Sequence, residues 1–275
     1  MSLRRLGSNL ALTGSGSIPG VIHINKFGAN FDIASDTTED VWDGGGTYSY
    51  PTLPLMTKLS QTANQAAMVG AEIEVQGLDA NWDLIVQTKA LNASNTTTPV
   101  TLDTPLLRAF RMKVLANVVG DSPIRLHNDA EDVDYAIISI GNNQTLMALY
   151  TVPFGKTAYL TNYYGGLVNT GVATPTNSQF DLWAADRVNN YEFQLKHEVG
   201  LPKEGPGFQH DFNPYVVFAE KTDIKISCGV EDKDGHAHAG FDIILIDNST
   251  RATRPGIVAT TFTGGAAPIV TEATP

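Results

Sequence analysis

Cysteine is almost absent from this chain of 275 residues, which has only Cys228. A single cysteine excludes an internal disulfide, and a fold without disulfides is compatible with assembly in a reducing cytoplasm. In the segment KISCGV, Cys228 is expected to face the core as a small apolar side chain. A catalytic thiol would need a histidine and an asparagine close to it in space, and a single sequence does not show such a neighbourhood.

Charge is scarce as well, at 17% of residues against about a quarter in an average protein. The balance is acidic, with a net charge of -11, and near the N-terminus Arg4 and Arg5 are the only clustered positive charges. Because an acidic surface is repelled by phosphate backbones, we expect no nucleic-acid partner. No apolar run approaches the length of a membrane helix, and the first 20 residues lack the apolar core of a signal peptide, so no membrane partner is expected either.

Helical periodicity is also scarce, and short strands with turns dominate. Residues 71–76 (AEIEVQ) alternate polar and apolar side chains, and a turn leads to 84–91 (LIVQTKAL), which predicts a hairpin. Residues 106–118 fit a helix or a strand, and their neighbours favour a strand. The runs 135–140 and 145–152, separated by Gly-Asn-Asn-Gln, predict a second hairpin.

The second half of the chain repeats this style. Residues 178–186 and 191–199 flank a turn and predict a hairpin, and Asp234-Gly235 predicts another between 221–230 and 241–247. A dozen short strands without strand–helix alternation predict an all-β fold, a β-sandwich or a jelly-roll-like fold.

Both ends of the chain mix small and polar residues with isolated apolar ones, and they predict extended arms at 1–22 and 248–275. Between the arms we expect two β halves, 23–150 and 151–247, which can belong to one domain. Apolar spots in the C-terminal tail suggest docking on a neighbour, for example another subunit in an oligomer. In the N-terminal arm we predict partner contacts at Leu3, Arg4, Arg5, Leu6, Leu10, Leu12 and Ile18.

A run of three glycines stands in the segment EDVWDGGGTYSYP. Its spacing does not match a dinucleotide fingerprint, so it is interpreted as a rigid turn pinned by aromatic rings. We expect a positive φ at one or more of these glycines and a buried tryptophan; an exposed tryptophan beside a groove would favour a sugar platform instead. The residues of this predicted turn are Trp42, Asp43, Gly44, Gly45, Gly46 and Tyr48.

Histidines supply the remaining candidates for chemistry. His236 and His238 follow several carboxylates and are weak metal candidates, but a zinc site would need further ligands and a solvated hairpin tip is the alternative. The pairs His197-Glu198 and His210-Asp211 could form an acid–base pair or a metal site, or each histidine could simply hydrogen-bond.

Other chemical motifs are weaker still. Asp181 and Asp186 could serve a glycosidase, a signal that any loop with carboxylates would give. Gly155-Lys156-Thr157 lacks both the earlier glycine and the following helix of a phosphate loop. We therefore expect no bound cofactor and no enzyme.

Two longer stretches carry a resemblance. Residues 24–51 (INKFGANFDIASDTTEDVWDGGGTYSYP) and 145–166 (TLMALYTVPFGKTAYLTNYYGG) resemble a group of virion structural proteins of tailed bacteriophages, and the resemblance covers most of 22–247. It implies a capsid decoration, or cement, protein that is assembled in the host cytoplasm and binds the major capsid protein on the capsid exterior. Such a protein is expected to act as a homotrimer, because closed symmetry makes weak contacts additive. The alternative is a tail, baseplate or head-fibre component that binds host glycans.

Overall fold

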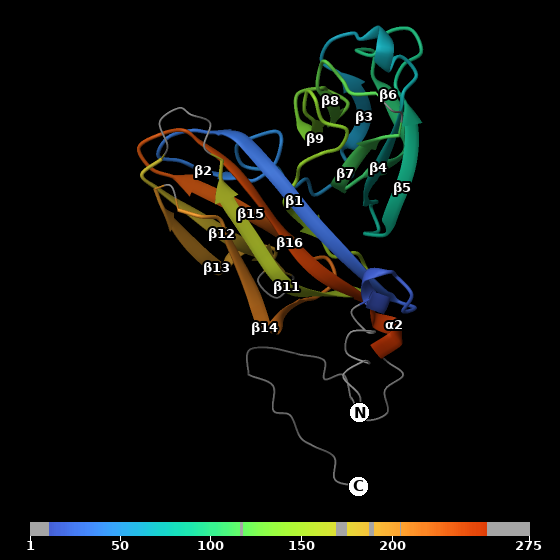
Figure 1. Ribbon diagram of the computed structural model, residues 1–275. Coiled ribbons are helices and arrows are strands. Elements are labelled where there is room, and N and C mark those ends of the chain that lie inside the picture. Colours follow the sequence, from blue (N-terminus) through green and yellow to red (C-terminus); the bar gives the residue numbers. More distant parts are fainter. Residues whose placement is uncertain (1–10, 116–117, 169–174, 187–189, 204, 252–275) are drawn as a thin grey trace.

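The protein is built almost entirely of β-strands, as the sequence predicts. The computed structural model describes residues 11–115, 118–168, 175–186, 190–203 and 205–251. Figure 1 shows two lobes, a sandwich of two sheets and a smaller lobe beside it. We call them the sandwich and the insert lobe (strands β3–β9).

The first sheet of the sandwich is antiparallel and has the strand order β1-β16-β11-β14. β1 is an edge strand, so β16 is its one neighbour in this sheet, and Val21 lies opposite Ile246 at one end of the pair. The strands are β1 (Val21–Ile33), β16 (Gly235–Asp247), β11 (Lys156–Leu167) and β14 (Phe208–Phe218).

The second sheet has the order β10-β15-β12-β13, and the short β2 pairs with β15. The inner faces of the two sheets meet in one apolar core, in which Tyr163, Phe180 and Phe241 are the largest fully buried side chains. A Cβ on Gly165 of β11 would lie 2.9 Å from the Phe180 ring of the opposite sheet, so this close packing requires glycine. The strands are β2 (Thr38–Asp40), β10 (Leu149–Thr151), β15 (Asp223–Val230), β12 (Asn177–Ala185) and β13 (Phe193–Pro202).

The strand order of the sandwich is that of a jelly roll. Without β2, each sheet contributes four strands, and in chain order they are β1 followed by β10 to β16. Renumbered along the chain, the two sheets read 1-8-3-6 and 2-7-4-5, so the first strand pairs with the last, and the chain changes sheet at every step except from β12 to β13. Two interleaved antiparallel sheets of this kind define the jelly roll, which viral capsid and lectin domains use.

The insert lobe contains two smaller sheets, β6-β3-β8-β9 and β5-β4-β7, and one 3-10 turn, η1 (Ala66–Met68). It has its own core, which includes Met56, Leu59, Ile73 and Met112. Its strands are β3 (Met56–Gln61), β4 (Glu72–Leu78), β5 (Leu84–Ala90), β6 (Val100–Leu106), β7 (Arg108–Val114), β8 (Ile124–His127) and β9 (Asp134–Ile138).

The chain leaves the sandwich and returns to it through two adjacent segments. The Ala148 amide donates to the Val41 carbonyl at 3.0 Å, and Trp42 and Met147 form an isolated antiparallel bridge. We expected a border at residue 150, between the halves 23–150 and 151–247, but strands pair across that border. The range 23–150 holds the insert lobe together with β1 and β2, which pair with strands of the second range.

A buried ion pair joins the two lobes. Arg108 of β7 donates through Nε and Nη2 to the two carboxylate oxygens of Asp223 of β15, at 2.8 and 2.9 Å. The guanidinium carbon lies 5.2 Å from the Tyr50 ring centre and 5.1 Å from that of Trp82. Both charged side chains are almost inaccessible to water, so this contact fixes the lobes by charge and by aromatic stacking.

Two of the four predicted hairpins are confirmed. β4 pairs with β5, and β12 with β13, while β7 confirms the strand assigned within 106–118. The hairpin predicted between 135–140 and 145–152 is wrong, because β9 pairs with β8 and β10 with β15. The Asp234-Gly235 hairpin is also wrong, because β15 and β16 belong to opposite sheets and their connection crosses the sandwich.

The described parts of the two arms outside β1 are not extended strands. Residues 11–14 form a helical turn before β1, and α2 (Asn248–Arg251) follows β16 directly. The Asp247 amide donates to the Gly20 carbonyl at 2.8 Å, which brings these two segments together (Figure 1). No helix among the described residues is long and apolar enough to cross a membrane.

Candidate functional site

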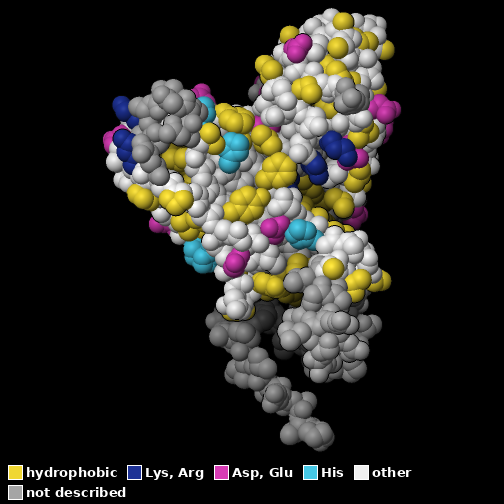
Figure 2. Space-filling model, viewed as in Figure 1, with side chains coloured by type: hydrophobic (Ala, Val, Ile, Leu, Met, Phe, Trp, Pro, Cys, Tyr) yellow, Lys and Arg dark blue, Asp and Glu magenta, His cyan; other side chains and the backbone are white. Residues whose placement is uncertain are grey.

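The outer face of the β1-β16-β11-β14 sheet, here called the open face, carries exposed apolar side chains. Phe27 and Phe31 of β1 are 36% and 41% exposed, and Tyr215 and Val217 of β14 are 47% and 53% exposed. Figure 2 shows hydrophobic side chains gathered on this side of the sandwich, next to histidine and acidic side chains. Several large exposed apolar groups in one area are characteristic of an interaction surface for a protein or another ligand.

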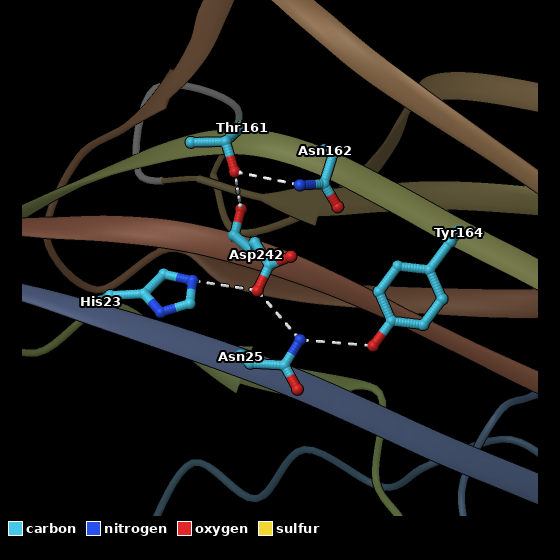
Figure 3. A network of polar contacts seen from close by, with 6 residues as sticks. All are labelled: His23, Asn25, Thr161, Asn162, Tyr164 and Asp242. Atoms are coloured by element: carbon cyan, nitrogen blue, oxygen red, sulfur yellow. Dashed lines mark hydrogen bonds and ion pairs between the residues drawn. The ribbon is translucent and has the colours of Figure 1, made fainter. Parts of the chain in front are cut away.

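A polar network lies between these apolar groups (Figure 3). Asp242 of β16 occupies its centre and accepts hydrogen bonds through Oδ1 from Asn25 Nδ2 at 2.9 Å and His23 Nε2 at 3.0 Å. Asn25 also donates to the Tyr164 hydroxyl at 3.3 Å, and Thr161 donates to the Asp242 carbonyl at 3.1 Å. Three neighbouring strands thus hold the side chains of this face in place.

Glycine at position 240 lets one aromatic ring lie flat on the sheet. A Cβ at Gly240 would lie 2.4 Å from the Tyr164 hydroxyl and 2.5 Å from Cζ of the same ring. Phe27 is the register partner of Gly240 on β1, so the two aromatic side chains belong to the same row of the open face.

The weak metal candidates His236 and His238 lie in β16 and not at a hairpin tip. They share one face of the strand and flank the Phe31 ring at centroid distances of 6.2 and 5.6 Å. Partial burial, and then the neighbouring His236, lower the pKa of His238. Within the described part of the chain, no three His, Cys, Asp or Glu side chains converge as metal ligands.

The glycine turn at 42–48 matches its prediction. Trp42 is only 6% exposed, and its ring meets the Tyr48 ring edge-on at 5.1 Å. Gly45 and Gly46 have φ values of 66° and 62°, and a Cβ at Gly44 would lie 2.1 Å from the Trp42 ring. The segment is therefore a structural turn, since the tryptophan is buried and cannot act as a sugar platform.

Three carboxylates hold this turn through hydrogen bonds to backbone amides. Glu39 accepts a hydrogen bond from the Gly46 amide at 2.6 Å, and Asp40 accepts one from the Tyr48 amide at 2.7 Å. Asp43 accepts from the Leu146 amide at 2.8 Å, across the two segments that join the lobes. Burial raises the pKa of Asp43 to about 7, while its hydrogen bonds oppose that rise.

His197 and His210 meet at the edge of the sandwich, where β13 and β14 come from opposite sheets. Their rings stack with centroids 4.0 Å apart, and His197 Nδ1 is 2.7 Å from the Tyr163 hydroxyl. Burial, and then the charge of His210, lower the pKa of His197. The structure thus brings these two predicted histidines together.

The remaining chemical candidates lie in strands, turns or the core. Asp181 of β12 lies opposite Glu198, and burial, followed by the charge of Glu198, raises the pKa of Asp181. Asp186 follows β12 and lies 3.8 Å from Lys196 Nζ. β11 begins at Lys156 directly after a turn at Gly155, so a strand follows the Gly-Lys-Thr segment. Cys228 is fully buried in the core, and burial raises the pKa of its thiol.

Most of the predicted arm contacts fall outside the described residues, namely Leu3, Arg4, Arg5, Leu6 and Leu10. Leu12 lies in the helical turn and is 42% exposed, which leaves it accessible to a partner. Ile18 is half-buried in the turn before β1, where its carbonyl accepts a hydrogen bond from the Val21 amide at 3.1 Å.

Comparisons with known proteins add no relative. No protein-family model matches this chain, and no curated protein matches it. The function is therefore inferred from the residues and their geometry.

Sequence reasoning missed the open face. The segment INKFGANF has an unusual spacing, yet nothing local shows which side of β1 stays open. The spacing of four residues between Phe27 and Phe31 was an available signal, because residues an even number apart in a regular strand share a face. The link from Asn25 to Asp242 spans 217 positions and has no local signature.

Proposed function

We propose that this chain is a non-enzymatic virion structural protein of a tailed bacteriophage. In this proposal it decorates the outer surface of the capsid shell, binds the major capsid protein as a homotrimer, and stabilises the shell. The resemblance of residues 22–247 supports the virion assignment, and the jelly roll is compatible with it because viral capsid domains use that fold. Fold alone does not determine function, so the surface must supply the remaining support.

The open face is the observation that carries the proposal. A rigid sheet exposes Phe27, Phe31, Tyr215 and Val217 around a fixed polar network, which suits binding to a broad protein surface. Aromatic side chains that are already ordered lose little conformational entropy on binding, so they make efficient anchors.

The proposed trimer explains how the protein could bind the capsid shell tightly. Each copy offers a modest apolar area, and one such contact is weak on its own. Three copies around a symmetry axis engage the shell together, and this avidity exceeds the affinity of any single contact. Leu12, exposed in the N-terminal helical turn, adds a second contact in the same scheme.

Co-sedimentation with emptied phage capsids tests the proposal. The wild-type protein should pellet with capsids, and the double variant Phe27→Ser/Phe31→Ser should lose most of this binding. Leu195→Ser is the matched control, because Leu195 is 45% exposed on β13 of the other sheet. If the double variant binds capsids as well as the wild type, the open face is not the capsid-binding surface. A monomeric solution mass at high concentration would exclude the trimer. Deletion of residues 2–20 tests separately whether the N-terminal arm contributes to capsid binding.

One observation favours the alternative, a tail, baseplate or head-fibre component that binds host glycans. Tyr164 lies flat over Gly240 beside the hydrogen-bonded Asn25 and Asp242, and an aromatic ring with oriented polar groups is a common way to hold a sugar. A glycan array with wild-type protein and Tyr164→Ala separates the functions. Tyrosine-dependent glycan binding without capsid binding would favour the alternative.

A further inference from the structure

A groove separates the edge strand β1 from the insert lobe. It has a volume of about 240 Å³ and is lined by residues of β1, β4, β5 and β7, together with Gln144, Thr145 and Tyr150. Leu84 and Val86 of β5 form an apolar part of the wall and are 45% and 58% exposed. Lys26 and Arg111 bring positive charge into the same groove.

Lys26 is unusual because it is buried and has no counter-ion among the described residues. Its side chain is 8% exposed, and its ammonium group donates to the neutral carbonyl oxygen of Phe110. Arg111 beside it donates to the neutral side chain of Gln144. Among the described residues, no carboxylate forms an ion pair with either cation. An unpaired buried ammonium is costly, and proteins almost always supply a partner.

Two acidic side chains on strands that flank the groove have partners of their own. Glu74 of β4 lies 3.5 Å from Lys113 and accepts from Gln76 at 2.8 Å. Asp242 is bound to His23 and Asn25 on the open face. Burial, and then the positive charge of Arg111, lower the pKa of Lys26 to about 7, which is the expected response of an ammonium group that lacks an anion.

We propose that this groove is the docking site for the chain's own C-terminal tail, with the carboxylate of Glu272 bound by Lys26 and Arg111. Glu272 carries the one acidic side chain of residues 252–275, so no other side chain of the tail can supply the missing negative charge. Ile269 and Val270 stand just before it and match the apolar wall at Leu84 and Val86.

The length of the tail is compatible with this assignment. α2 ends at Arg251, next to the end of the β1–β16 pair where Val21 lies opposite Ile246. Lys26 lies five positions further along β1, about 17 Å away at the rise of a strand. The 21 residues from Arg251 to Glu272 can span up to about 70 Å when extended, so they reach the groove with slack.

Zero-length cross-linking of the full-length protein tests this contact. A carbodiimide joins a carboxylate to an amine where the two touch, and mass spectrometry of the digest should find an amide between Glu272 and Lys26. The exposed pair Lys89–Asp103 of the insert lobe is the internal positive control, because its groups are in contact. A Lys89–Asp103 product without a Lys26–Glu272 product would overturn the proposal. A mixture of ¹⁴N and ¹⁵N chains adds a second criterion, because cross-links of mixed isotope content would overturn the assignment to the chain's own tail.

Peptide binding gives an independent measure. A labelled peptide of residues 264–275 is titrated into full-length protein that carries Glu272→Gln, whose own tail competes less well. The same peptide with glutamine at position 272 should bind at least about tenfold more weakly, since a charge-assisted hydrogen bond is lost. Lys26→Met in the protein should cause a similar loss, and it leaves no unpaired buried charge that would threaten folding. Equal affinity of both peptides would refute the role of Glu272.

Discussion

The ion pair between Arg108 and Asp223 gives the sharpest stability prediction. Its side chains are 8% and 5% exposed, and it joins β7 of the insert lobe to β15 of the sandwich through two short hydrogen bonds. Arg108→Met removes the guanidinium and leaves the Asp223 carboxylate buried without its cation. Loss of one partner from such a pair costs about 3–5 kcal/mol, a large share of the roughly 5–15 kcal/mol by which proteins are stable.

Urea unfolding measures this loss. Tryptophan fluorescence is an apt signal, because the Trp82 ring packs against the Arg108 guanidinium. Lys89→Met is the control; its partner Asp103 is 68% exposed, so the variant should lose only about 0.2–1 kcal/mol. The double variant Arg108→Met/Asp223→Leu should recover part of the loss, because no unpaired charge remains.

A loss below about 1 kcal/mol for Arg108→Met would refute the reasoning, since that is the range of an exposed ion pair. A double variant less stable than both single variants would also contradict it. In that case the attraction between the two charges would outweigh the free energy lost when they are removed from water.

Three further predictions concern the glycine turn and the histidine stack. Gly44→Ala should lower the urea midpoint more than Gly200→Ala, because a Cβ would meet the Trp42 ring at 2.1 Å in the first case and nothing within 4 Å in the second; equal midpoints would contradict this. The raised pKa of Asp43, about 7, means that the folded state binds more protons between about pH 4 and 7, so this group weakens the fold as pH rises through that window. Asp43→Asn should therefore raise the unfolding free energy at pH 8 with little effect near pH 4, and an equal effect at both would refute the assignment. The pKa of His197 is lowered, so the unfolded state binds more protons below about pH 6.5 and stability should fall as pH drops through that value; His197→Gln should flatten the dependence in urea titrations at pH 5 and 7.5.

Local patterns predicted the local structure well. The alternation in residues 71–76 and the turn after it are enough to form the β4–β5 hairpin, because both strands and their turn lie in one short segment. The glycine turn could also be predicted, since three consecutive glycines readily adopt the positive φ values of a tight turn and the neighbouring aromatic rings can pack against it. The all-β class, with a β-sandwich or a jelly roll as the two options, followed from the number of short strands and the lack of helices, and the strand order decides for the jelly roll.

Pairing between distant strands could not be predicted in this way. The chain does bend just before Asp234-Gly235, at residues 231–233, yet the strands on either side pair elsewhere, β16 with β1 and β15 with β12. The Arg108–Asp223 contact spans 115 positions, and neither residue carries a local mark of it. The open face of β1 escaped prediction for the same reason, because burial depends on which sheet covers which side and the strand itself does not encode this.

The pairing of β1 with β16 has a consequence for how the protein is made. β1 leaves the ribosome first among the sandwich strands, and its one sheet neighbour, β16, leaves last. The insert lobe, whose strands pair within residues 56–138, is complete long before that. Contacts between distant segments form slowly because a long loop must close first. The insert lobe can therefore fold during synthesis, whereas the jelly roll must wait for the last strand to complete it.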